Sequence, residues 1–530
     1  YLDKPFTPGE AILFLEDNQI KLKASYDKFL NSLLAHSQEH PEAEHGEGFW
    51  IDHWHYNIDL LESYLAIYPE SLKEIFFENK MFTFFDNTEI VKPRSEKYVL
   101  KDNSLRQFHS VGLDNSKREM IRKRVSFPHL VRTEYGNGQV YRTTLVNKML
   151  CLLANKLASL DPFGCGIEME ADKPNWYDAL NGLPGLMGSS LCETFELKRL
   201  VLFIESAIKT ADIKKISVTE EICDFLMGLG GLLKEYFNSQ SRDKDYIYWD
   251  KSYALKEAYR QKTKLGVSGK EIDTDVSTLN TIFQDAIKKI NLGISKAFDV
   301  RKDVYYGYFI NEATKHETTK NQAVKPLEFR QIKLPLFLES QMHALRLAEN
   351  PDKAESLHKG TKNSELFDKK LKMYKVTASL TSMPEEIGRC RVFTPGWLEH
   401  ESIWLHMEYK YLLELLKQGL YAEFYEDFKN ALIPFQNPSR YGRSILENSS
   451  FLVSSAFPDK SLHGNGFVAR LSGSTVEFMQ MWLVMNAGKK PFFLDAKNEL
   501  SLKFQPALAG WLFDQKGSYS FNFLSKIRVT

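Results

Sequence analysis

The sequence predicts a mostly α-helical protein with a small β region in its C-terminal part. Apolar residues recur at helical spacing in long segments, and few stretches show the alternation of a half-buried strand. From Gly488 the pattern changes, and we expect a hairpin around Lys497 and Asn498 and strand structure in residues 518–529. The expected helices span residues 8–36, 57–68, 141–158, 197–211, 218–237, 253–262, 276–297, 337–348 and 404–418.

Length and composition indicate a folded globular protein. With 530 residues the chain can bury a large core, and one helical barrel could account for most of it. Its 69 basic residues balance 69 acidic residues, which argues against binding to nucleic acid or to an anionic membrane through net charge. No apolar run reaches the roughly 18 residues of a membrane span.

The cysteines favour a reducing compartment. There are five, at Cys151, Cys165, Cys192, Cys223 and Cys390. An odd number without a Cys-x-x-Cys pair suits neither a disulfide framework nor a metal site, so we expect a cytoplasmic protein. The chain begins without Met and without a signal peptide, which we interpret as an internal cut in a longer protein.

The most informative stretch covers residues 175–190. Its turn-forming residues are Gly182, Pro184, Gly185 and Gly188, and they predict an irregular loop. A helix is expected to follow, with Ser190 and Glu193 forming a capping box.

The same loop has the composition of a sugar site. Asp178 follows Trp176 and Tyr177. An aromatic face packs on a pyranose ring, and a partly apolar wall raises the pKa of a carboxyl group so that it can hold a proton. The alternative is a helix-entry loop in which Asp178 is a local cap.

A second stretch, residues 46–68, has polar and aromatic residues at the start of a helix. They are Trp50, Asp52, His53, Trp54, His55 and Tyr56. The spacing of two residues between the histidines splays their rings apart, so we expect no metal site here. We predict a carbohydrate subsite formed by Asp52, His53, Trp54 and Tyr56, and the alternative is an aromatic packing turn.

Two further segments could supply an anion site. Glu399 and His406 lie two helical turns apart, so both could face one cavity if a helix begins near Glu399; an ordinary aromatic-rich helix is the alternative. Ser472, Gly473 and Ser474 open a helix expected to run to about residue 486. Backbone N–H groups there, with hydroxyl groups and a nearby cation, suit phosphate, although the same residues form ordinary caps.

Two charged segments are predicted to be exposed. Lys117, Arg118, Arg122, Lys123 and Arg124 lie among acidic residues, which favours a solvated helix face over a nucleic-acid site. Residues 352–375 are expected to form a surface excursion.

In this order, over about residues 46–490, the motifs resemble the cellobiose and chitobiose phosphorylases. Residues 175–178 are similar to their Asp-Trp-Asn-Asp signature, whose last Asp is the general acid. Glu399 with His406 resembles their Glu-Asn-Gly…His pattern, and Ser472-Gly473 resembles their Ser/Thr-Gly phosphate loop. Asp52 and its aromatic neighbours resemble the loop that holds the non-reducing glucosyl unit.

The amino-acid sequences of several motifs more closely resemble those of the large β-oligoglucan phosphorylases, which act on 1,3- or 1,2-linked chains. These are Gly-Phe-Trp-Ile-Asp-His-Trp, Asn-Gly-Leu-Pro-Gly and Gly-Arg-Ser-Ile-Leu-Glu-Asn-Ser-Ser. Asn175 and Tyr177 depart from the disaccharide-phosphorylase signature, which argues against a disaccharide-specific pocket.

The resemblance implies an (α/α)6 barrel, the six-hairpin glycosidase fold, with the site at its mouth. An N-terminal β-sandwich normally precedes the barrel, and this chain is expected to be a fragment without it. The implied domains are a linker-helix region at 1–40, a catalytic barrel at 41–487 and the start of a C-terminal β region at 488–530. Members commonly dimerise.

The resemblance also implies inverting phosphorolysis, without a metal or other cofactor and with inorganic phosphate as co-substrate. Asp178 would protonate the glycosidic oxygen while phosphate attacks the anomeric carbon from the opposite face. The implied phosphate-binding residues are His406, Ser472, Gly473, Ser474 and Arg443 or Arg470. The implied substrate-binding residues are Asp52, His53, Trp54, Tyr56, Trp176, Tyr177 and Glu399.

Two other functions stay open at this point. An inverting hydrolase on the same barrel would need a carboxylate base, for which Glu399 or Glu447 could serve. The other is a carbohydrate-binding fragment without catalysis.

Overall fold

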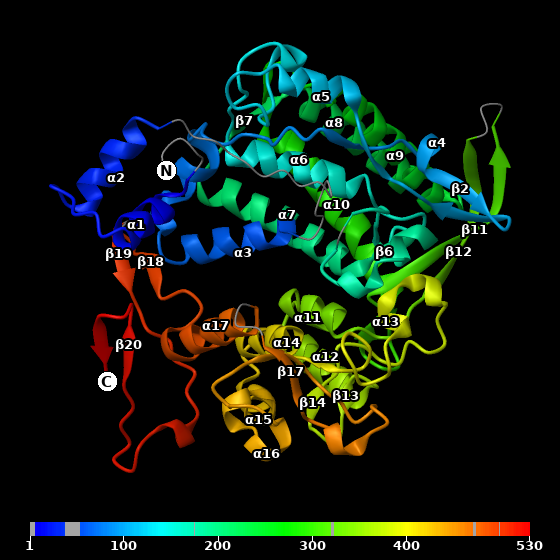
Figure 1. Ribbon diagram of the computed structural model, residues 1–530. Helices are drawn as coiled ribbons and strands as arrows, with labels where there is room; N and C mark the ends of the chain where they lie inside the picture. Colours follow the sequence, from blue (N-terminus) through cyan, green and yellow to red (C-terminus); the bar gives the residue numbers. More distant parts are fainter. Residues whose placement is uncertain (1–5, 38–52, 174, 320–322, 470–472, 498) are drawn as a thin grey trace.

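A computed structural model (Figure 1) describes residues 6–37, 53–173, 175–319, 323–469, 473–497 and 499–530. Helices make up most of its regular structure, and the sheets are small and scattered. The predicted mostly α-helical class is therefore confirmed.

The helices match most of the expected segments. Their bounds are α1 (Pro8–Asp17), α2 (Tyr26–Ala35), α3 (His53–Leu65), α4 (Arg94–Lys97), α5 (Asn115–Arg122), α6 (Leu145–Leu157), α7 (Leu191–Thr210), α8 (Glu220–Asn238), α9 (Lys244–Thr263), α10 (Val276–Ala297), α11 (Leu338–Arg346), α12 (Pro351–Asn363), α13 (Arg389–Val392), α14 (Leu405–Lys417), α15 (Tyr421–Ala431), α16 (Pro438–Tyr441) and α17 (Gly473–Ala487).

The long helices pack in a continuous series. In spatial order α8, α10, α7, α11, α14 and α17 each contact the next, and α9, α6, α12 and α15 pack against members of this series. Residues far apart in the sequence are brought together in this way, because α3 also packs on α7 and α17 packs on α14.

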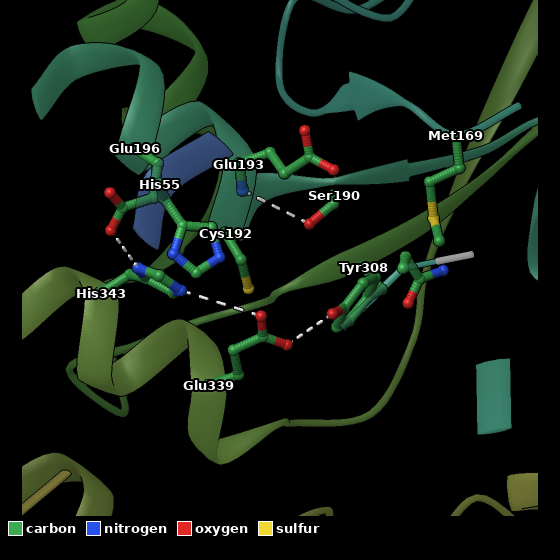
Figure 2. Close-up of a pocket in the computed structure, with 10 residues that line it drawn as sticks. His55, Met169, Ser190, Cys192, Glu193, Glu196, Tyr308, Glu339 and His343 are labelled. Carbon is green, nitrogen blue, oxygen red and sulfur yellow. Dashed lines mark hydrogen bonds and ion pairs between the residues drawn. The ribbon is translucent and has the colours of Figure 1, made fainter. Parts of the chain in front are cut away.

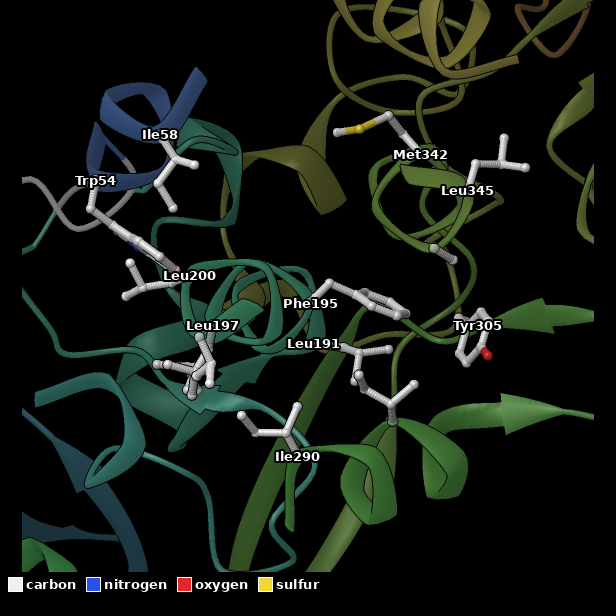
Figure 3. Packing of buried hydrophobic residues seen from close by; sticks show 14 of the residues in the cluster. Trp54, Ile58, Leu191, Phe195, Leu197, Leu200, Ile290, Tyr305, Met342 and Leu345 are labelled. Atoms are coloured by element: carbon white, nitrogen blue, oxygen red, sulfur yellow. The ribbon is translucent and has the colours of Figure 1, made fainter. Parts of the chain in front are cut away.

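The centre of the core is α7. Apolar residues cover more than one face of this helix, as expected of a helix enclosed by others. Figure 3 shows Leu191, Phe195 and Leu200 of α7 among side chains of α3, α10 and α11. The Ser190 hydroxyl accepts a hydrogen bond from the backbone N–H of Glu193 at 3.5 Å. In a full capping box the Glu193 carboxylate would accept a hydrogen bond from the backbone N–H of Ser190. Here it pairs with Lys156 instead.

The strands all pair antiparallel. They are β1 (Glu89–Val91), β2 (Tyr98–Lys101), β3 (Ser104–Gln107), β4 (Val111–Leu113), β5 (Ile167–Glu168), β6 (Gly188–Ser190), β7 (Lys215–Thr219), β8 (Glu271–Asp275), β9 (Phe298–Asp299), β10 (Val304–Tyr305), β11 (Tyr308–Thr318), β12 (Val324–Lys333), β13 (Phe367–Asp368), β14 (Met373–Tyr374), β15 (Ile403–Trp404), β16 (Ser449–Leu452), β17 (Gly466–Ala469), β18 (Phe492–Leu494), β19 (Leu500–Leu502), β20 (Phe521–Phe523) and β21 (Ile527–Val529). Within the described part of the chain, two sheets have more than two strands, in the orders β12-β11-β6-β5 and β15-β16-β17.

The long hairpin β11–β12 was not expected from the sequence. Figure 1 shows it reaching out from the helices, and only the first residues of β11, 308–311, are continuously buried. Beyond residue 311 most residues of the hairpin are partly or fully exposed, although Val324 and Pro326 at the outer end of β12 are buried. The sequence therefore lacks the regular alternation of a half-buried strand.

The segment 8–36 forms two helices, so the prediction of a single helix was wrong. α1 ends at Asp17, and Gln19 adopts a positive φ of 53°, which a continuing helix does not allow. Ser25 then begins α2 by accepting a hydrogen bond from the N–H of Lys28 at 3.3 Å.

The segment 352–375 is not a surface excursion. It contains most of α12 and the hairpin β13–β14, and Leu357 and His358 of α12 are buried. α12 is an amphipathic helix whose charged residues occupy the face turned away from α11. The high charge of the segment made this helix hard to recognise in the sequence.

The basic segment on and after α5 is only partly solvated. Lys117 and Arg124 both pair with the buried carboxylate of Asp86, at 2.7 Å each. Two of the five cations predicted to be exposed are therefore used inside the protein.

The C-terminal part contains the expected hairpin, β18–β19, and a second one, β20–β21. All five cysteines have free thiols. Among the described residues no helix has the length and apolar character needed to cross a membrane, in agreement with the sequence.

Candidate functional site

The loop before α7 has the irregular course that its glycines predict. Asn175 accepts a hydrogen bond from the N–H of Tyr177 at 2.9 Å, and a short 3-10 helix begins at Asp178. A guanidinium N–H of Arg389 donates to the Asp178 carbonyl at 3.3 Å, and the Arg389 backbone N–H donates to Asn181 at 3.1 Å. The segment around α13 therefore holds this loop, while the Asp178 side chain is exposed.

The sheet β15-β16-β17 gathers the three motifs that follow in the sequence. Ile403 pairs with Leu452, and Phe451 pairs with Phe467. α14, which carries His406, begins directly after β15, and α17 begins shortly after β17. The amide of Asn448, just before β16, donates to the Thr475 hydroxyl at 3.0 Å. One small sheet thus places the histidine and the start of α17 side by side.

His406 lies where these motifs meet. Its ring centroid is 5.9 Å from that of Trp176, two residues before Asp178. A Cβ built on Gly473 would lie only 2.6 Å from His406 Nδ1, so the first residue of α17 lies directly against the imidazole. On the other side of the ring, Nε2 is 3.5 Å from a carboxylate oxygen of Glu477. The ring therefore presents Nδ1 to the N-terminus of α17.

A buried lysine completes this group. Lys410 lies one turn after His406 on α14 and is 3 % exposed. Its ammonium group donates to the Tyr56 hydroxyl at 3.2 Å and lies 5.9 Å from the Trp176 ring centroid. Residues from α3, the loop, α14 and α17 thus surround one position.

The electrostatics of this group favour an anionic ligand. Burial disfavours the charged form of Lys410, but the neighbouring Tyr56 and Glu477 outweigh it and raise the pKa of the ammonium group above its ordinary value. Burial also raises the pKa of Tyr56, so its hydroxyl stays neutral. A buried cation thus lies one helical turn from His406, and the His406 ring contacts the first residue of α17, where the N–H groups of the helix N-terminus attract negative charge.

Ser474 belongs to the start of α17, whereas among the described residues no hydrogen bond or ion pair joins Arg443 to His406 or Lys410. Ser474 is buried in the first turn of α17. The Arg443 guanidinium pairs with Glu447 at 3.2 Å, and its buried Nε has no hydrogen-bond partner among the described residues. Arg443 belongs to the same segment as Asn448, which contacts α17.

Two predicted substrate residues are enclosed in the protein instead. Trp54 is 7 % exposed and packs in the core beside Leu200 and Ile58 (Figure 3), because α3 begins earlier than expected and turns Trp54 away from Tyr56. Tyr177 is 2 % exposed, and its hydroxyl donates to the Glu399 carbonyl. Neither ring is open to a sugar, so these two predictions need correction.

From the sequence, Glu399 and His406 were expected on one face of a helix beginning near Glu399, and that condition is not met. α14 begins at Leu405, so Glu399 precedes the helix and does not share a helical face with His406. Glu399 nevertheless lies beside the loop, through its carbonyl contact with Tyr177. The predictions for Asp52, Arg470 and Ser472, and for the side chain of His53, lie outside the described residues.

Sequence reasoning missed Lys410, Glu477 and Arg389 at this site. Lys410 and Glu477 each follow a predicted residue by four positions on a helix, His406 and Gly473 respectively. That spacing puts both members of each pair on one helix face, which makes Lys410 and Glu477 candidates but does not distinguish them from surface residues. Comparison of the chain with models of protein families and with curated proteins gave no match.

Proposed function

We propose that the protein is an inverting glycoside phosphorylase. It cleaves β-1,3- or β-1,2-linked glucan oligosaccharides with inorganic phosphate, releasing α-glucose 1-phosphate and a chain one unit shorter. The observation that supports this most is the position of His406, between Trp176 of the loop and Gly473 at the start of α17. A group that donates a proton and a group that binds an anion are expected on opposite sides of the bond that breaks.

In this proposal Asp178 donates a proton to the glycosidic oxygen. Phosphate, held by the start of α17 with His406 and the charge of Lys410, attacks the anomeric carbon from the opposite face. Because phosphate arrives as an anion, no second carboxylate is needed as a base. Trp176 provides the apolar wall for the sugar, and Glu477 orients His406.

The proposal includes the (α/α)6 barrel as the finer description of the fold. The continuous series of packed helices around α7 is compatible with that arrangement. The site would then lie at one end of the barrel, and a homodimer is the proposed assembly.

The direct test uses both directions of the reaction. Incubation with phosphate and laminari- or sophoro-oligosaccharides is expected to release glucose 1-phosphate. Incubation with glucose 1-phosphate and laminaribiose, sophorose or cellobiose, followed by linkage analysis, identifies the bond made. Glucose released without phosphate would show a hydrolase, and binding without turnover would show a carbohydrate-binding protein.

Substitution of the general acid gives the first mutational prediction. Asp178→Asn is expected to lower the phosphorolysis rate by about a hundredfold or more, because the amide cannot donate the proton. Thermal stability is expected to stay unchanged, since the side chain is exposed. Asp212→Asn, at another exposed carboxylate, is the control and should keep full activity. Near-normal activity of Asp178→Asn would refute the mechanism.

A further inference from the structure

A small cavity lies between α3, α7 and α11, next to the loop that carries Asp178 (Figure 2). Its volume is about 10 Å³, which is room for one water molecule or one ion and not for a sugar ring. Asn175 of the loop lines it. Cys192, Glu339 and His343 line it as well. The site of the proposed reaction does not use this cavity.

Three side chains at the cavity present metal-binding atoms to one another. The Cys192 sulfur, a Glu339 carboxylate oxygen and a His343 ring nitrogen all lie within 4.8 Å of each other, and all three residues are buried. His343 Nε2 is 3.7 Å from Glu339 Oε1. Zinc bonds of about 2.0–2.2 Å in tetrahedral geometry place such N and O ligands about 3.4 Å apart.

The next layer of contacts has the arrangement found around metal ligands. His343 Nδ1 is 2.7 Å from a carboxylate oxygen of Glu196, so its Nε2 is turned to the cavity (Figure 2). The Tyr308 hydroxyl donates to the other oxygen of Glu339. Carboxylate and hydroxyl partners of this kind fix the orientation of a ligating imidazole and carboxylate.

His55 lies beside this group, although its ring nitrogens are not within 4.8 Å of all three donor atoms. It lines the same cavity from α3 and is 5 % exposed. Among the residues that the structure describes, its Nδ1 has no hydrogen-bond partner. Its ring centroid is 6.0 Å from that of His343. A buried ring nitrogen without a partner is costly, and a bound ion would remove that cost.

We propose that Cys192, Glu339 and His343 bind one Zn²⁺ ion, and that the His55 ring turns toward the ion as a fourth ligand. A thiolate and two imidazoles favour zinc over calcium or magnesium, which prefer oxygen ligands. The two negative charges of a thiolate and a carboxylate balance the charge of the ion, so the buried site is neutral. From the sequence, no metal site was expected at His53 and His55. The proposed site instead uses His55 with residues of α7 and α11, which lie far away in the sequence.

The role of this ion is structural. It connects α3, α7 and α11 beside the loop of the candidate active site, and no step of the proposed phosphorolysis passes through it. The zinc site and the phosphorylase activity can therefore be tested separately.

The test is metal binding by the whole chain. Chelator-treated protein is expected to take up one Zn²⁺ per chain, measured by metal analysis after dialysis. Co²⁺ in place of Zn²⁺ is expected to give a thiolate-to-cobalt charge-transfer band, which reports the Cys192 sulfur directly. The Cys192→Ser variant should lose this band and bind Zn²⁺ at least about tenfold more weakly.

Two further variants serve as a control and as a replacement for Cys192→Ser. Cys223→Ser replaces another buried cysteine, on α8, and should retain both the band and the bound zinc. If Cys192→Ser does not fold, His55→Gln is used, and weaker Zn²⁺ binding is expected there as well. Absence of stoichiometric binding to the wild-type protein, or a band that persists in Cys192→Ser, would overturn the proposal.

Discussion

At the scale of single residues, Gly473 has no space for a side chain. Its Cβ would lie within 3 Å of three atoms of the His406 ring, which is already confined by Trp176 and Glu477. Gly473→Ala is therefore expected to displace the imidazole and lower kcat/KM for phosphate by about tenfold or more. Initial rates at varied phosphate concentration measure this effect.

A matched glycine provides the control. Gly231 lies on α8, and a Cβ built there meets no atom within 4 Å. Gly231→Ala should keep wild-type kinetics, with unchanged or slightly higher stability because alanine favours the helix. Unchanged phosphate kinetics in Gly473→Ala would mean that His406 does not take part in phosphate binding.

The residues of the site differ in how well the sequence predicted them. His406 and Gly473 belong to motifs of unusual composition, so they could be identified from the sequence alone. Trp54 could not be placed, because its direction depends on where α3 begins, and one early turn of helix moved it into the core. Lys410 lies in the middle of an ordinary helix, where only its partners Tyr56 and Trp176 distinguish it from a surface lysine.

At the scale of elements, α12 shows how a charged sequence can hide a buried face. His358 on this helix is 2 % exposed and hydrogen-bonds through Nδ1 with the Tyr411 hydroxyl of α14, at 3.1 Å. Burial, assisted by the charge of Lys362, lowers the pKa of His358 to about 4. The residue is therefore neutral in the folded protein at pH values where the unfolded chain already binds a proton.

This shift makes stability depend on pH in a defined direction. The unfolded pKa is about 6.5, so the unfolded state binds more protons between about pH 6.5 and pH 4, and stability falls as pH falls through this window. Between pH 7.5 and pH 5 the loss from His358 amounts to about 2 kcal/mol. His358→Gln should remove this part of the pH dependence, measured by urea unfolding at both pH values.

An exposed histidine is the control for this prediction. His36→Gln, at the end of α2, should leave the pH dependence of the wild-type protein unchanged. An identical pH dependence in His358→Gln and the wild-type protein would mean that His358 is not buried as a neutral group.

The small sheet β15-β16-β17 marks the limit of prediction at this scale. β15 has two residues, too few for a periodic pattern, and its partner β16 lies about 50 residues further along the chain. The helices that flank it, by contrast, have long apolar patterns and were predicted with nearly correct bounds. Local patterns thus gave the helices, while the pairing that brings the motifs together is a property of the tertiary fold.

At the scale of the whole molecule, a buried network of charges joins the helices that surround the candidate site. Arg346 of α11 lies 3.0 Å from Glu196 of α7 and 3.1 Å from Glu414 of α14. Asp59 of α3 lies 3.6 Å from the same guanidinium and 2.6 Å from Arg199 of α7. Burial opposes ionisation of Asp59, but Arg346 and Arg199 lower its pKa to about 2. One arginine therefore connects carboxylates of three other helices.

Removal of this arginine gives the largest expected loss of stability. Arg346→Met keeps much of the side-chain volume but removes the cation that the buried carboxylates of Glu196 and Glu414 share. Glu196 still pairs with Arg199 and His343, and Glu414 still pairs with Lys417. Removing one partner of a buried ion pair costs about 3 kcal/mol, and these remaining cations reduce the loss, but the midpoint of urea unfolding at pH 7 should still fall clearly. Lys214→Met breaks an ion pair whose side chains are about 80 % exposed and should change stability by less than about 0.5 kcal/mol. Equal effects of the two substitutions would mean that these helices are held by apolar packing alone.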